Sequence, residues 1–243
     1  TVGSDPEGLA VGLVAGGFAG VLNTGVLTGR VNLASIDGSG LVNTGDWTTS
    51  GPSLLASLNS NTLVNTETGA IRITNGSIGL ASVSGNNRVV NAGLIEGAGA
   101  TTFGLATVTG DNSLSNSGEF IASGVNTIGM ATVTGDNTIQ NEGEVRLSGV
   151  NTIGMATADG SNVFNNAGLF ASAGVTTFAM AATGDNTVNN TGVMQVDGRL
   201  RFLGGAGLQF NNAGGFLDMR DGDTNDRTYV SGDFNGGVGS RLG

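Results

Sequence analysis

The sequence predicts an all-β protein: a right-handed parallel β-helix whose three-sided coils of about 20–25 residues stack into a solenoid of about 9–10 coils. Two observations predict this fold class. A short Asn-x-Gly motif recurs along almost the whole chain, and apolar residues alternate with a period of 2 inside each repeat. No segment combines helix-forming residues with the 3.6-residue period of an α-helix, which excludes helical repeats and leucine-rich repeats.

The Asn-x-Gly motif defines the repeat length. Its glycines lie at positions 25, 45, 93, 118, 143, 168, 192 and 214, and a variant over Asn65–Gly69 fills the one gap. The spacing is 25 residues in the middle of the chain and shorter at both ends. An internal period of this size indicates stacked structural repeats.

Each repeat contains three short patterns typical of strands. Because equivalent residues of successive coils lie about 4.8 Å apart, similar side chains are expected in columns. The first strand aligns Ile95, Phe120, Val145, Phe170 and Met194; the second aligns Phe103, Ile128, Ile153 and Phe178, then Leu105, Met130, Met155 and Met180; the third aligns Val89, Leu114, Ile139, Phe164 and Val188.

Two columns of asparagine flank the third strand. One contains Asn87, Asn112, Asn137, Asn162 and Asn186, and the other contains Asn91, Asn116, Asn141, Asn166 and Asn190. They lie two residues on either side of an inward apolar position, so alternation places them inside the solenoid. Buried amides must be hydrogen-bonded, and stacked amides can bond along the axis. We therefore predict structural ladders, in preference to the alternative of ligand binding.

We expect one domain over residues 1–243. An irregular N-terminal coil should occupy residues 1–24, regular coils residues 25–214, and a C-terminal coil residues 215–243. The apolar stretch over residues 8–22 is interrupted by glycines and is shorter than the roughly 20 residues that span a bilayer. It is therefore interpreted as one or two buried strands.

The composition excludes several partners and chemistries. The net charge is −10, and all nine basic residues are arginine, which argues against nucleic acid and against docking on anionic membranes. The absence of cysteine removes disulfides and thiolate metal sites. The absence of histidine removes the commonest general base. We expect no cofactor and no enzymatic activity.

Calcium is the one metal that the sequence favours at all. Asp111 and Asp136 recur at one predicted corner, together with Asp185, and carboxylates are natural calcium ligands. Asp221 and Asp223 have the alternating spacing of a calcium loop, but the segment lacks the glycine and glutamate of an EF-hand. Turn-forming acidic residues are the preferred interpretation at both places. The aligned Thr107-Val-Thr109 and Thr132-Val-Thr134 are expected on the surface.

The C-terminal segment carries a resemblance to a known family. The stretches Asn212-Ala-Gly-Gly-Phe-Leu-Asp-Met, Asp221-Gly-Asp-Thr-Asn-Asp and Val230-Ser-Gly-Asp-Phe-Asn-Gly-Gly resemble the end of autotransporter passenger domains, which are pectin-lyase-like β-helices. The resemblance implies that residues 215–243 begin an autochaperone-like region and that a translocator β-barrel follows in the full-length protein. The barrel, the complete autochaperone region and a catalytic module are lacking here.

The expected function is that of a non-enzymatic adhesin or stalk on the bacterial cell surface, anchored to the outer membrane through a region after this chain. Its expected partners are glycans or proteins of host or cell surfaces, or further copies of itself. A surface-layer or filament subunit is the first alternative, because solenoid ends carry free strand edges. A carbohydrate-active β-helix enzyme is the second, disfavoured by the missing histidine and lysine.

Overall fold

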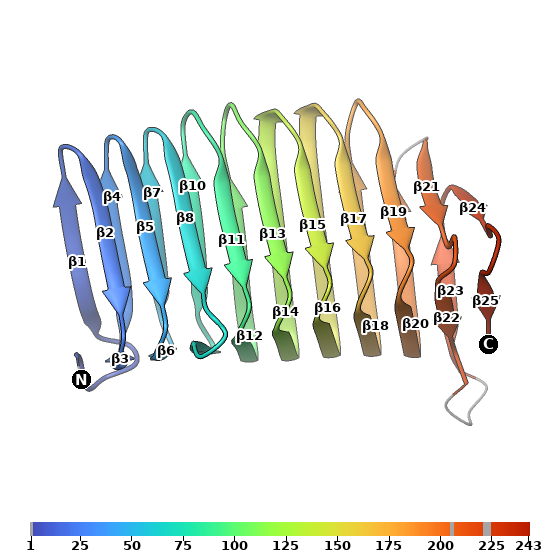
Figure 1. Ribbon diagram of the computed structural model, residues 1–243, viewed down its shortest axis with the longest axis horizontal. Coiled ribbons are helices and arrows are strands. Elements are labelled where there is room, and N and C mark those ends of the chain that lie inside the picture. Colours follow the sequence, from blue (N-terminus) through green and yellow to red (C-terminus); the bar gives the residue numbers. More distant parts are fainter. Residues whose placement is uncertain (1, 205–206, 221–224) are drawn as a thin grey trace.

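The computed structural model describes residues 2–204, 207–220 and 225–243. Over these residues the chain has strands and turns but no helix, and it forms a parallel β-solenoid of about 9 turns (Figure 1). As the chain advances from left to right in Figure 1, the front strands run down and the rear strands run up, which is a right-handed winding. The predicted fold class is confirmed. Accordingly, no described segment is a helix that could cross a membrane.

The strands form two long parallel sheets. The ten-stranded sheet contains β2 (Phe18–Asn23), β5 (Gly38–Asn43), β8 (Ser60–Asn65), β11 (Asn87–Asn91), β13 (Asn112–Asn116), β15 (Asn137–Asn141), β17 (Asn162–Asn166), β19 (Asn186–Asn190), β21 (Leu208–Asn211) and β24 (Asp233–Asn235). The fifteen-stranded sheet contains β1 (Leu9–Ala15), β3 (Val26–Thr28), β4 (Arg30–Ser35), β6 (Asp46–Thr49), β7 (Pro52–Ser57), β9 (Ala70–Thr74), β10 (Ser77–Ser82), β12 (Leu94–Ala106), β14 (Glu119–Thr134), β16 (Glu144–Asp159), β18 (Leu169–Ala181), β20 (Val193–Gly204), β22 (Phe216–Asp218), β23 (Arg227–Val230) and β25 (Arg241–Leu242).

The larger sheet supplies two of the three sides of each coil. In the N-terminal coils these sides are separate strands, such as β9 and β10. In the central coils they merge into one long strand that bends at a glycine. Gly124, at the bend of β14, has φ +107°, and a Cβ there would lie 2.5 Å from the carbonyl oxygen of Gly99 in the preceding coil. Only glycine fits this corner without strain.

The predicted columns are present in the core. Phe120 pairs in register with Val145, which pairs with Phe170. Met130, Met155 and Met180 stack in the same way and are buried, as core-filling methionines. Towards the C-terminus the core becomes a file of phenylalanine rings whose neighbouring centroids lie 4.7–5.6 Å apart: Phe164, Phe170, Phe178, Phe202, Phe210 and Phe234.

The Asn-x-Gly motif has a double physical basis. At Asn116 the side-chain Nδ2 donates to the carbonyl of Gly118 at 3.2 Å, closing the turn after the third strand. A Cβ on Gly118 would lie 2.2 Å from the carbonyl oxygen of Gly93 in the coil before it. The asparagine therefore ties the turn, and the glycine lets successive turns stack in backbone contact.

The N-terminal coil corrects one expectation. Residues 8–22 do form two strands, β1 and β2, but these strands are not buried. Val14 is 86% exposed, Phe18 64% and Leu22 65%. Alternation turns these three side chains to the outside, while the inward Ala19 stays buried.

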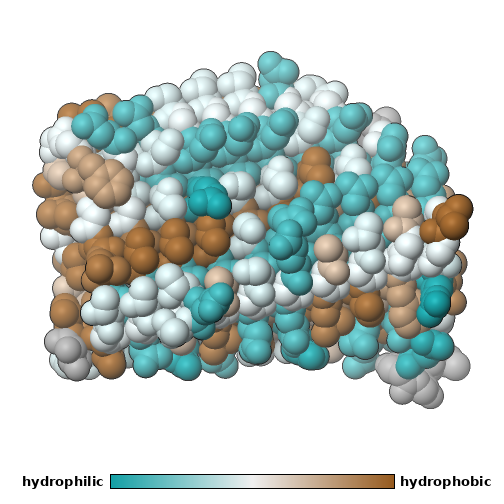
Figure 2. Space-filling view, in the orientation of Figure 1, coloured by the Kyte–Doolittle hydropathy of each residue, from teal (hydrophilic) through white to brown (hydrophobic). Residues whose placement is uncertain are grey.

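The outer face of the ten-stranded sheet changes character along the solenoid. One outward column begins with Leu22, Val42, Val64 and Val90 and continues as Ser115, Gln140, Asn165, Asn189, Asn211 and Asn235. Figure 2 shows the apolar band over the N-terminal coils. In the polar half, Asn189 donates to Asn165 at 2.8 Å, and Asn211 donates to Asn189 at 2.9 Å. An amide stack therefore also exists outside the core.

Candidate functional site

Every asparagine of the two predicted ladders lies inside the solenoid. The first ladder runs through Asn61, Asn87, Asn112, Asn137, Asn162 and Asn186, with side-chain distances of 2.9–3.1 Å. The second runs through Asn23, Asn43, Asn65, Asn91, Asn116, Asn141, Asn166, Asn190 and Asn212, at 2.7–2.9 Å. In each step Nδ2 donates to the Oδ1 of the next coil. These amides satisfy one another, so they are structural and do not face a ligand.

A third inward polar column was missed by the sequence interpretation. Thr101 donates to Asn126, and Asn126 donates to the Oδ1 of Asn151 at 3.0 Å. All three side chains are buried, on the second strand. Extending the alternation of Ile128 and Met130 by one step would have placed Asn126 inside.

The threonines predicted on the surface also need a correction. Thr107 and Thr132 are buried, and the Oγ1 of Thr132 donates to the carbonyl of Gly110 at 3.0 Å. Thr109 and Thr134 are exposed, as expected. The outward threonine column of this side is a different one, formed by Thr102, Thr127, Thr152 and Thr177.

Asp111 and Asp136 stack at one corner, where each side chain bonds the backbone of the next coil. The Oδ1 of Asp111 accepts from the N–H of Asp136 at 2.9 Å, and the Oδ1 of Asp136 accepts from the N–H of Ser161 at 2.7 Å. The Oγ of Ser161 accepts from the N–H of Asp185 at 3.2 Å. This shared role explains why aspartate, asparagine and serine alternate in the column.

The calcium expectation stays a prediction at this corner. Within residues 2–204, 207–220 and 225–243, no three acidic side chains gather in a way that could hold a metal ion. Asp221 and Asp223 lie outside the described residues.

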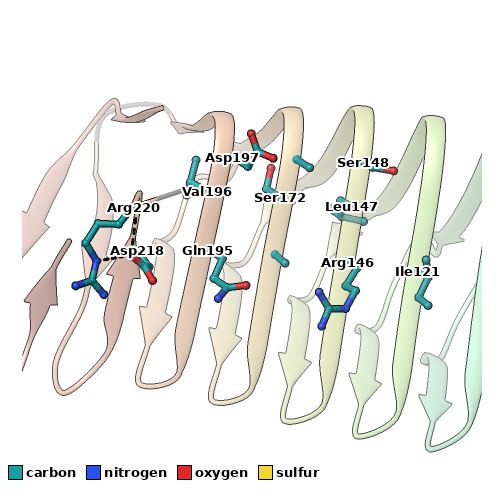
Figure 3. A pocket seen from close by; sticks show the side chains of 12 residues that line it. Ile121, Arg146, Leu147, Ser148, Ser172, Gln195, Val196, Asp197, Asp218 and Arg220 are labelled. Carbon is teal, nitrogen blue, oxygen red and sulfur yellow. Dashed lines mark hydrogen bonds and ion pairs between the residues drawn. The ribbon is translucent and has the colours of Figure 1, made fainter. Parts of the chain in front are cut away.

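The best candidate for a ligand site is a groove of about 500 Å³ on the first-strand side of the C-terminal coils (Figure 3). One outward column along it reads Arg146, Ala171, Gln195 and Asp218. A second reads Ser148, Ala173 and Asp197. The hollow exists because β18 presents only alanine where the neighbouring coils present long polar side chains.

The groove mixes charges of both signs. Arg220 donates from Nε to the Oδ1 of Asp218 at 2.9 Å, and Arg146 forms an ion pair with Glu144. The hydrogen bond from Arg220 lowers the pKa of Asp218 below its usual value, so this carboxylate stays ionised in mildly acidic solution. Guanidinium and amide donors thus surround a small apolar floor together with carboxylate and hydroxyl acceptors. Such a lining suits a ligand rich in hydroxyl groups.

No protein-family model, no curated protein and no solved structure matches this chain. The class of protein is therefore defined by the fold alone, as a parallel β-solenoid.

Proposed function

We propose that this chain is an autotransporter-passenger-type β-helix that acts, without catalysis, as an adhesive stalk on a bacterial cell surface. The observation that carries the proposal is the unbroken amide stack from Asn23 to Asn212, which ties successive coils together along the axis. A solenoid held in this way is a stiff support for sites on its outer sides. Stiffness suits a stalk, because it holds a binding surface away from the membrane.

The groove supplies the contact chemistry of this proposal. Arg146 and Gln195 are both exposed and stand on either side of Ala171. Their planar groups hydrogen-bond several hydroxyls at once. A single groove of this kind binds weakly, but many rods on one cell engage a surface together, and the combined avidity exceeds each contact. A surface glycan is the partner class that this lining favours.

The test uses beads coated with the purified chain and layered on cultured epithelial cells. The double variant Arg146→Ala/Gln195→Ala should reduce bead retention several-fold, because it removes the donors on both sides of the groove. Arg88→Ala/Gln140→Ala is the matched control, since it deletes the same two residue types from the outer face of the ten-stranded sheet. Equal losses in both variants, or no retention of wild-type beads, would refute the groove as the adhesive site.

A filament subunit is the second candidate, favoured by the first described coil. β1 and β2 lie at the ends of their sheets, and Phe18 and Leu22 are exposed beside these edges. Such edges pair readily with another chain. Electron microscopy of the purified chain distinguishes the two candidates, because ordered end-to-end filaments that disappear in Phe18→Ser would favour the subunit.

A further inference from the structure

Three arginines gather on the second-strand side of the last coils, outside the groove. Arg199 and Arg201 lie on β20, and Arg227 lies on β23. The two strands pair in parallel, so Arg199 lies beside Arg227 and Arg201 lies beside Tyr229. Together with Leu200 and Leu203 these residues line a hollow of about 430 Å³. We call it the arginine hollow.

The charges in the arginine hollow are not balanced by the protein. In the described part of the chain, none of the three guanidinium groups forms an ion pair or a hydrogen bond. The carboxylate nearest in sequence, Asp226, accepts instead from the backbone N–H of Gly198 at 2.6 Å. Three of the nine basic residues therefore meet at one place in a chain of net charge −10.

The arrangement is unfavourable for the isolated protein. Like charges directly opposite each other on paired strands destabilise a sheet. The preceding coils avoid this arrangement: the position of Arg199 is Val175, Val150 and Val125 in turn, and the position of Arg201 is threonine. The charge thus appears abruptly in one coil, where a bound anion would offset the repulsion.

The lining indicates the chemical class of that anion. Guanidinium groups bind sulfate and carboxylate in bidentate geometry, which lysine cannot do. The 56% exposed ring of Tyr229 and the half-exposed Leu203 add apolar surface and a phenolic hydroxyl beside the charges. A nucleic acid is disfavoured, because three arginines on an acidic protein cannot follow a phosphodiester chain.

The neighbouring surface extends the hollow towards a longer ligand. Thr177 lies beside Arg201 in register, and Thr152, Thr127 and Thr102 continue the row at one residue per coil. The next outward column is Ala179, Gly154, Gly129 and Gly104, so the row of hydroxyls lies beside a low surface of small residues. We propose that the arginine hollow binds the acidic group of a sulfated or carboxylated saccharide, whose neutral part lies along the threonine row.

This proposal adds a ligand class to the adhesive role, and it rests on that role only for its biological setting. The test is calorimetric titration of the purified chain at physiological salt with a heparin-derived octasaccharide, an oligogalacturonate and a neutral dextran oligosaccharide. We expect one or both acidic saccharides to bind and dextran not to bind. The two acidic probes distinguish sulfate from carboxylate as the recognised group.

Variants locate the binding. Arg201→Gln should weaken the acidic saccharide about tenfold, the loss expected for one charge-assisted contact, whereas Arg88→Gln, an exposed arginine on β11, should leave binding unchanged. Arg199→Gln should likewise weaken binding and should also raise the unfolding temperature, because it relieves the repulsion from Arg227. That opposite pair of effects separates a binding role from a folding defect.

Three results would overturn the proposal: no binding of either acidic saccharide, equal weakening by Arg88→Gln, or inorganic sulfate binding as tightly as the saccharides. The adhesion of coated beads is a separate measurement. Saccharide binding without bead retention would leave the arginine hollow standing and remove the stalk's adhesive role. Bead retention without saccharide binding would do the reverse.

Discussion

Asn116 donates from Nδ2 to the Oδ1 of Asn141 in the next coil at 2.9 Å, and both side chains are buried. The same nitrogen also contacts the carbonyl oxygens of Gly118 at 3.2 Å and Glu144 at 3.1 Å. One amide therefore joins three features: the ladder, its own turn and the start of the first strand one coil later. The ladder and the turns form a single network, and damage to one member should affect both.

Asn116→Ala should strongly destabilise the solenoid. It leaves the Oδ1 of Asn141 buried without a donor, and each such group costs about 1–3 kcal/mol. Thermal unfolding followed by circular dichroism measures the effect. Ser115→Ala, a change at the adjacent outward position, is the control and should leave the unfolding temperature nearly unchanged. Equal unfolding temperatures for the two variants would contradict a stabilising ladder.

Ser39→Asn should stabilise the protein by extending the first ladder by one coil. Ser39 pairs in register with Asn61, whose Oδ1 is buried without a partner. The hydroxyl of Ser39 already donates to the carbonyl of Ala56 at 2.9 Å, the position at which Asn61 donates to Ala81. An asparagine there would keep this bond and add one to Asn61, with a net gain of about 0.5–1.5 kcal/mol.

Ser39→Leu is the control for that prediction, because leucine is close to asparagine in size but has no amide. The two variants should shift the midpoint of urea unfolding in opposite directions. A lower midpoint for both would mean that the site has no room for a larger side chain, and the prediction would fail.

The corner aspartates give a prediction that includes metal removal. Asp136→Asn keeps an acceptor for the N–H of Ser161, so stability should be retained, whereas Asp136→Ala should cost about 0.5–1.5 kcal/mol. Treatment with EDTA should leave the wild-type unfolding temperature unchanged if the column is purely structural. A decrease with EDTA that disappears in Asp111→Asn/Asp136→Asn would instead assign calcium to this corner.

The Asp218–Arg220 pair predicts a pH dependence. Because the hydrogen bond from Arg220 lowers the folded-state pKa of Asp218, the pair stabilises the folded state above the unfolded value, about 3.9. This contribution is lost as the pH falls through the lower folded value. Carbon-detected NMR titration of the carboxylate should give a midpoint below about 3.9, and Arg220→Gln should raise it. An unchanged midpoint would show that the contact does not persist in solution.

The columns and ladders were predictable because a fixed repeat places equivalent residues one above another. The register of Phe120, Val145 and Phe170 therefore follows from counting 25 residues. The arginine hollow was not predictable in this way, since Arg201 and Tyr229 are 28 residues apart and belong to a coil of different length. The groove was equally hidden, because it depends on alanines that look unremarkable in one repeat and become a hollow only between longer neighbours.

Gly118→Ala and Gly129→Ala separate two kinds of glycine in this fold. A Cβ at Gly118 would lie 2.2 Å from the carbonyl oxygen of Gly93, whereas a Cβ at Gly129 would have no heavy atom within 4 Å. The backbone of stacked turns cannot move apart at one coil without breaking the bonds of its neighbours. We expect Gly118→Ala to lower the unfolding temperature markedly or to prevent folding.

Gly129→Ala, in contrast, should be neutral or stabilising by about 0.4–1 kcal/mol, because alanine restricts the unfolded chain and the next-but-one coil already carries Ala179 at the equivalent position. Both variants add one methyl group to a strand-rich repeat, so their difference measures the close contact between coils. Similar unfolding temperatures for the two would show that the turns are farther apart than the structure indicates, and the account of the Asn-x-Gly motif would then be wrong.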